Sequence, residues 1–186
     1  MSNENRYEKD NRYAIKEIWC NNIKYDYENF SLLKEDTLKN SFYFHLRHKL
    51  TDRVLEENRL KIYTEYYHDG LRADLVIAQL CEEPGLNGHL RNDVVDILAV
   101  VEMKYKYDTN DDPFQKDIVK VQNYIKNLNY KNCLYYLAFI HEVVNPDNEY
   151  SWLTQRDLKW AKDKVRELNG YFIEGNDEPV FQIISY

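Results

Sequence analysis

The sequence of 186 residues is poor in glycine, proline and cysteine, with five, four and three of them respectively. So few flexible and turn-forming residues argue against a disordered or low-complexity chain. The cysteines Cys20, Cys81 and Cys133 are odd in number and widely spaced. They match neither a disulfide framework nor a zinc site, which favours a reducing compartment, the cytoplasm.

Long hydrophobic runs are also lacking, and the first thirty residues are polar with charges of both signs. These two features argue against a membrane-spanning protein and against a signal peptide. The length fits one domain covering residues 1–186, with enough chain to bury a core.

The formal net charge of −7 is unevenly distributed. Residues 61–112 hold eleven acidic and five basic residues, while the remainder of the chain is close to balanced. This acidity excludes a protein that coats DNA through a broad basic surface. A phosphate-containing substrate is still compatible, because one or two divalent cations would offset much of the local negative charge.

Hydrophobic periodicity predicts a mixed α/β fold with a partly helical N-terminal extension at 1–30, a core at 31–141 and a C-terminal helix and strand at 142–186. Expected helices cover 32–57, with Ser31 as a possible cap, 114–128 and 154–168, the last ending at Gly170. Expected strands cover 61–67, 72–79, 93–107, 132–141 and 181–186, and a turn at 68–70 joins the first two as a hairpin.

Charged residues interrupt two of the apolar strands. Asp74 lies among Ala73 and Leu75, while Glu102 and Lys104 end the apolar run 94–101. Strand side chains alternate faces, so Glu102 and Lys104 point to the same side. An ionisable group inside an apolar strand must be paired, hydrogen-bonded or bound to a metal. Each residue alone would fit an ion pair on a solvated strand, but three on neighbouring strands favour a functional site.

An Asp on the second strand and Glu-x-Lys on the third, in this order of elements, resemble the PD-(D/E)XK nuclease superfamily. The resemblance spans residues 31–141 and implies a restriction-endonuclease-like αβββαβ core, with a central mixed sheet flanked by helices. The chain departs from the family pattern in having Ala73 where proline often precedes the Asp, and in the long interval between Asp74 and Glu102.

The resemblance also implies a metal site. Asp74, Glu102 and the backbone carbonyl of Met103 would hold Mg²⁺, or Mn²⁺, through the hard oxygen ligands that these ions prefer. Lys104 would orient the attacking water or stabilise negative charge in the transition state. Glu65 takes the place of a further acidic residue on the first strand, although it also fits a solvated aromatic face.

Other residues near these strands have two interpretations each. Lys116 and Lys120 follow the motif on the next helix and would contact substrate phosphates, or form its solvated face. Glu35 is the nearest match to an acidic residue that some family members carry on the first helix. Five tyrosines either stack on bases or pack within the sheet: Tyr63, Tyr66, Tyr67, Tyr105 and Tyr107.

The sequence therefore predicts a metal-dependent nuclease that hydrolyses phosphodiester bonds, with DNA favoured as the substrate. Its partner is expected to be nucleic acid, and a homodimer is left open. Two alternatives keep the fold: a catalytically silent module that binds nucleic acid or protein, and a subunit of a larger nuclease or defence complex.

Overall fold

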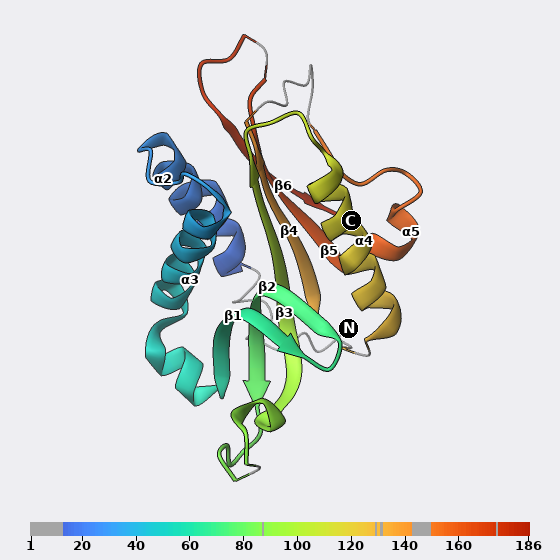
Figure 1. Ribbon diagram of the computed structural model, residues 1–186. Coiled ribbons are helices and arrows are strands. Elements are labelled where there is room, and N and C mark those ends of the chain that lie inside the picture. Colours follow the sequence, from blue (N-terminus) through green and yellow to red (C-terminus); the bar gives the residue numbers. More distant parts are fainter. Residues whose placement is uncertain (1–12, 87, 129, 131, 143–149, 174) are drawn as a thin grey trace, which may run out of the picture.

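The computed structural model describes residues 13–86, 88–128, 130, 132–142, 150–173 and 175–186. At its centre is one mixed six-stranded sheet in which the strands lie in sequence order (Figure 1). The strands are β1 (Leu60–His68), β2 (Leu71–Leu80), β3 (Val94–Lys106), β4 (Leu134–His141), β5 (Val165–Tyr171) and β6 (Val180–Ser185). Helices flank both faces (Figure 1), so the predicted α/β class is confirmed.

Strand direction divides the sheet into two antiparallel edges and a parallel centre. β1, β2 and β3 are successively antiparallel, and β5 pairs antiparallel with β6. β3, β4 and β5 are parallel, and every residue of β4 is buried. The predicted hairpin is confirmed, because His68 pairs with Leu71 across Asp69 and Gly70, which both have positive φ.

One face of the sheet is covered by the N-terminal segment and by α3 (Glu35–Glu57). The N-terminal segment contains a π-helical turn, η1 (Ile18–Ile23), followed by α2 (Lys24–Glu28). The helical spacing predicted for this segment is confirmed, since Ile15 and Trp19 are both buried against the sheet. Residues 1–12 of the predicted extension lie outside the described residues.

Helix α3 begins later than Ser31, so the predicted cap is wrong. The hydroxyl of Thr37 instead accepts the N–H groups of Leu33 at 2.8 Å and Lys34 at 3.0 Å. The apolar side chains of Leu38, Phe42, Leu46 and Leu50 are buried against the sheet. At Thr51 the backbone is non-helical (φ 56°), which interrupts the helical phase, so Leu55 rather than Val54 is buried beyond it.

The other face is covered by α4 (Asp112–Asn127), which connects the parallel strands β3 and β4, and by the single turn of α5 (Leu158–Ala161) (Figure 1). Phe114, Ile118 and Val121 of α4 are buried, as the sequence predicted. Within the described residues, no helix combines the length and apolarity needed to span a membrane.

The predicted helix over 154–168 is wrong. Only α5 is helical there, and the chain then enters the sheet as β5. A charged residue that would suit the solvent-exposed side of a helix is instead hydrogen-bonded inside the protein. Glu167 is fully buried in β5 and accepts the backbone N–H groups of Trp152 at 3.1 Å and Leu153 at 2.8 Å. These long-range hydrogen bonds override the local amphipathic pattern.

Gly170, predicted to end that helix, lies in β5 between two large side chains. A Cβ atom placed there would lie 3.1 Å from both Ile140 Cγ1 and Phe181 Cζ. Gly170→Val should therefore lower the free energy of unfolding by about 1–3 kcal/mol through overpacking. Denaturant unfolding checks this, with Ser185→Val at the exposed end of β6 as the control. Equal stability of the two variants would contradict the packing described here.

Candidate active site

The site is built where β2 and β3 separate. Their ladder includes the pair Leu75–Val101, but from Asp74 towards the hairpin turn β2 has no ladder partner on β3. There the carboxylate of Asp74 accepts the backbone N–H of Met103 at 2.8 Å. A side chain thus replaces the backbone acceptor that the neighbouring strand would provide. This separation leaves room for side chains to meet between the two strands.

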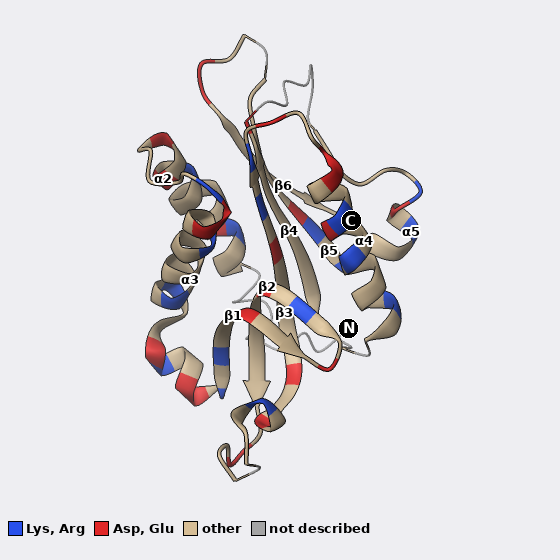
Figure 2. Ribbon diagram, viewed as in Figure 1, with Lys and Arg blue, Asp and Glu red and all other residues tan. Residues whose placement is uncertain are grey.

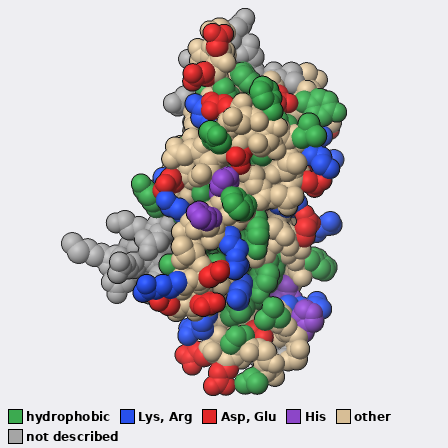
Figure 3. Space-filling view, turned by 90° about the vertical axis from the view of Figure 1, so that its left-hand side faces the viewer, with side chains coloured by type: hydrophobic (Ala, Val, Ile, Leu, Met, Phe, Trp, Pro, Cys, Tyr) green, Lys and Arg blue, Asp and Glu red, His purple; other side chains and the backbone are tan. Residues whose placement is uncertain are grey.

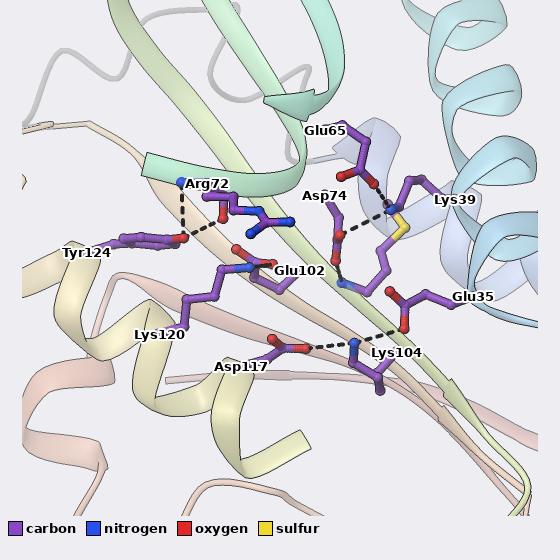
Figure 4. A network of polar contacts seen from close by, with 11 residues as sticks. Glu35, Lys39, Glu65, Arg72, Asp74, Glu102, Lys104, Asp117, Lys120 and Tyr124 are labelled. Carbon is purple, nitrogen blue, oxygen red and sulfur yellow. Dashed lines mark hydrogen bonds and ion pairs between the residues drawn. The ribbon is translucent and has the colours of Figure 1, made fainter. Parts of the chain in front are cut away.

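Where β2 separates from β3, helix α4 provides hydrogen-bond partners for the backbone of β2. The Tyr124 hydroxyl accepts the N–H of Arg72 at 3.2 Å and donates a hydrogen bond to the carbonyl of the same residue. The hairpin end of β2 is therefore fixed to the helix rather than to the next strand. In Figure 4 the side chain of Arg72 is directed towards the space between Asp74 and Glu102.

A local distortion of β1 places Glu65. Its φ is 51°, in the left-handed region, and the ladder with β2 omits the pair Glu65–Asp74. The distortion accompanies close packing of Tyr63 and Tyr66, three residues apart, whose ring centroids are 6.0 Å apart. A left-handed non-glycine residue costs about 1 kcal/mol. This distortion accompanies the contact of the Glu65 carboxylate with α3.

Eight ionisable side chains from α3, β1, β2, β3 and α4 meet here (Figure 4). This charged cluster consists of Glu35, Lys39, Glu65, Asp74, Glu102, Lys104, Asp117 and Lys120. Figure 2 shows acidic and basic positions along β3, in the space between α3 and α4. The predicted residues Asp74, Glu102, Lys104 and Glu65 are thus brought together.

Lysine side chains connect the carboxylates of the charged cluster. Lys39 forms ion pairs with Glu65 and with Asp74, the latter at 3.1 Å. Its side chain is only 10 % exposed. The Lys39 ammonium therefore lies between two carboxylates that the sequence assigns to a metal site. Lys39 is thus one of the buried residues of α3.

Lys104 connects both faces of the sheet. Its Nζ lies 2.8 Å from Glu35 on α3 and 3.4 Å from Asp117 on α4. Glu102, two residues earlier on β3, pairs with Lys120 of α4 at 2.6 Å. Glu102 and Lys104 thus both reach α4, which confirms that they share a face. Glu35, the nearest sequence match to a helix acid, belongs to the charged cluster.

Burial sets the electrostatics of Glu102, whose side chain is fully buried. Loss of solvation raises the pKa of Glu102 to about 8, and the charge of Asp74 adds to this while Lys120 opposes it. Oxygen Oε1 of Glu102 has no hydrogen-bond partner among the described residues. A buried acceptor in that state is a natural position for a ligand that donates or coordinates.

The three lysines of the charged cluster, unlike Glu102, keep their charged form. Burial disfavours the ammonium form, yet neighbouring carboxylates hold the pKa of Lys104, Lys39 and Lys120 above the usual value. For Lys104 these are Glu35, Asp117 and Asp74. Lys104 therefore stays charged at neutral pH, and it can stabilise negative charge but not accept a proton.

The donor chemistry of the charged cluster fits a hard divalent cation. Its five carboxylates exceed its three ammonium groups by two charges when all are ionised. Met103 directs its N–H to Asp74, and because the C=O of a strand residue lies on the same edge, its carbonyl also faces the gap. No three described His, Cys, Asp or Glu side chains converge as a preformed metal group. A cation would thus have to displace the Lys39 ammonium.

Two members of the charged cluster were not predicted as site residues, and one candidate lies outside it. Lys39 follows the buried Leu38 and lies one helical turn after Glu35, a spacing that could have indicated a shared position. Asp117 lies one turn before Lys120 on α4. Lys116 is exposed and makes no ion pair with the charged cluster within the described residues.

Comparison with known proteins adds no relative: no family model, curated protein or solved structure matches the chain. The likeness to PD-(D/E)XK nucleases accordingly rests on the motif residues and on their order along the chain. The fold and the charged cluster have to be interpreted from their own chemistry.

The raised pKa of Glu102 predicts a dependence of stability on pH. Between about pH 5 and 8 the folded state keeps a proton on Glu102 that the unfolded state has already released, so stability should fall as the pH rises through this range. Relative to Glu102→Gln, the wild type should lose about 2 kcal/mol of unfolding free energy between pH 5.5 and 7.5. Urea unfolding in EDTA at several pH values measures this.

The control for that experiment is Glu57→Gln, at the exposed end of α3. Its stability should follow the wild type at every pH. Parallel curves for the wild type and Glu102→Gln would show that Glu102 titrates as an exposed carboxylate, contrary to the burial described above.

Lys39 predicts a second measurable effect. Replacing it by methionine keeps a long side chain and removes the ammonium that contacts Glu65 and Asp74. Lys39→Met should therefore bind Mn²⁺ about tenfold more tightly than the wild type, a gain of about 1.4 kcal/mol. Titration calorimetry measures the affinity, and Lys49→Met on the outer side of α3 is the matched control. Equal or weaker binding of Mn²⁺ by Lys39→Met would show that the Lys39 ammonium does not compete with the cation.

Proposed function

We propose that the chain is a metal-dependent nuclease of the PD-(D/E)XK type, with a restriction-endonuclease-like core and nucleic acid, DNA in particular, as its substrate. The observation that carries this proposal is the meeting of Asp74, Glu102 and Lys104 where β2 leaves β3. Charged groups so deeply placed contribute little to stability, because their loss of solvation offsets their attraction. A catalytic role explains their presence better than a structural one.

Asp74, Glu102 and the carbonyl of Met103 would hold Mg²⁺ or Mn²⁺. The ion, when bound, supplies a Lewis acid for the phosphate and lowers the pKa of water. The residues prepare this position in advance, since Asp74 is fixed by the Met103 N–H at 2.8 Å and Glu102 by Lys120 at 2.6 Å. Glu102 would hold the cation in its deprotonated, carboxylate form.

Lys104 supplies positive charge beside the reacting phosphate. Its ammonium is held by Glu35 and Asp117, so it is oriented before substrate arrives. In this position it stabilises the negative charge that develops on the phosphate oxygens or orients the attacking water. Arg72 makes no ion pair within the described residues and is directed towards the same space (Figure 4), so its guanidinium is available for a phosphate oxygen.

One observation favours a second candidate, a nuclease-like module without catalysis. The carboxylates of the charged cluster have lysine partners, and no preformed three-ligand group occurs within the described residues. A cluster in which each carboxylate contacts a lysine can act as a purely structural network. Cation binding separates the two candidates, because a silent module has no need to exchange Lys39 for a metal.

Nuclease assays test the first candidate. Wild type, Asp74→Asn and Lys104→Met are incubated with single- and double-stranded DNA and RNA, with Mg²⁺, Mn²⁺ or EDTA. We expect cleavage by the wild type only with a divalent cation, and losses of about 10²-fold or more in both variants. Lys106→Met, two residues further along β3 and paired with Asp108 at the surface, should retain activity.

The outcomes divide the two candidates. Equal activity in wild type, Asp74→Asn and Lys104→Met would exclude the proposed site. Absence of cleavage, together with absence of calorimetric heat on adding Mn²⁺, would support the silent module.

A further inference from the structure

A pocket lies beside the charged cluster, on the edge strand of the sheet. It is lined by residues 63–67 of β1, by His89, Leu90 and Arg91 of the connection between β2 and β3, and by Val94. Glu65 belongs both to this pocket and to the charged cluster. The pocket therefore adjoins the charged cluster at Glu65.

The lining of the pocket is mainly aromatic surface. Tyr63 and Tyr66 stack with an interplanar angle of 27°. Tyr66 is only 8 % exposed, and both hydroxyl oxygens are buried. A ligand in this pocket would therefore meet ring surface rather than hydroxyl groups. Three of the five tyrosines noted in the sequence, Tyr63, Tyr66 and Tyr67, line this pocket.

The rim of the pocket presents apolar surface and positive charge. Tyr67 is 72 % exposed and Leu90 is 46 % exposed. The side chain of Arg91 donates a hydrogen bond to His89 Nδ1 at 3.2 Å, within the same short segment. This bond still leaves guanidinium N–H groups that can reach a phosphate. A flat ring with polar edges and an attached phosphate matches all of these features.

The spacing also fits a nucleic-acid chain. Tyr67 lies two residues from Glu65, which is at most about 7 Å along the chain. Stacked nucleotides rise about 3.4 Å each, so the pocket is within one or two nucleotides of the charged cluster. On the face seen in Figure 3, acidic and basic side chains are interspersed, so a broad basic surface does not provide the binding there.

We propose that this pocket holds the base of an unpaired nucleotide next to the scissile phosphodiester. The proposal rests on the proposed nuclease function and specifies its substrate as single-stranded, or locally unpaired, nucleic acid. The base stacks on the exposed ring of Tyr67 and packs against the aromatic and apolar lining of the pocket. Arg91 contacts the phosphate of the same nucleotide.

Binding by the whole chain tests this with Ca²⁺ in place of Mg²⁺, so that association is followed without relying on cleavage. The probes are a fluorescein-labelled oligothymidylate of about 12 nucleotides and a duplex of the same length, compared by anisotropy. Leu90→Glu places a carboxylate at the rim. Leu86→Glu is the matched control, because Leu86 is 75 % exposed in the same connection but does not line the pocket.

We expect the wild type to bind the single strand more tightly than the duplex. Leu90→Glu should weaken single-strand binding about tenfold, as loss of one stacked base does, and Leu86→Glu should match the wild type. Tyr67→Ala, which removes the exposed ring, should also weaken it about tenfold. Preference for the duplex, or equal binding by Leu90→Glu and Leu86→Glu, would overturn the proposal.

Activity separates this proposal from the nuclease function. Cleavage by the wild type with equal rates in Leu90→Glu and Leu86→Glu would overturn the base pocket and leave the nuclease. Selective loss of single-strand binding in Leu90→Glu, without any cleavage by the wild type, would support the pocket and remove the catalytic proposal.

Discussion

The hydrogen bond from the Met103 N–H to Asp74 is the contact around which the site is arranged. It stands where the β2–β3 ladder stops, and it lets the two strands diverge without leaving that donor unsatisfied. Divergence opens the space in which Glu102 and Lys104 contact α4, while Glu35 of α3 reaches Lys104 from the other side. A continued ladder would close this space. The function proposed for the chain therefore depends on a local interruption of its sheet.

Much of the fold was predictable because its elements have clear periodicity. The stripe on α4, the hairpin at Asp69 and Gly70, and the continuous apolar run of β4 were all confirmed. The region that became β5 was predicted wrongly, because its charges suggested a solvated helix. Glu167 is instead buried and bonded to backbone N–H groups fourteen and fifteen residues earlier. Such distant partners leave no local trace in the sequence.

The candidate site also contains some residues that the sequence identifies and others that only the packing of the helices reveals. Asp74, Glu102 and Lys104 were identifiable because charges inside apolar strands conflict with their surroundings, and that conflict is visible in one dimension. Lys39 and Asp117 were missed because a charged residue on an amphipathic helix causes no such conflict. Only the packing of α3 and α4 against the sheet shows that these two side chains turn inwards.

In the proposed function, a metal ion would replace a lysine within the charged cluster. Lys39 occupies the space between Glu65 and Asp74, and Glu102 keeps a proton near neutral pH. The most direct test is a crystal structure with Mn²⁺, located by its anomalous scattering. The account predicts Mn²⁺ between Asp74, Glu102 and the Met103 carbonyl, with Lys39 displaced. A crystal in which Mn²⁺ is absent from this position, while Lys39 still joins Glu65 to Asp74, would contradict it.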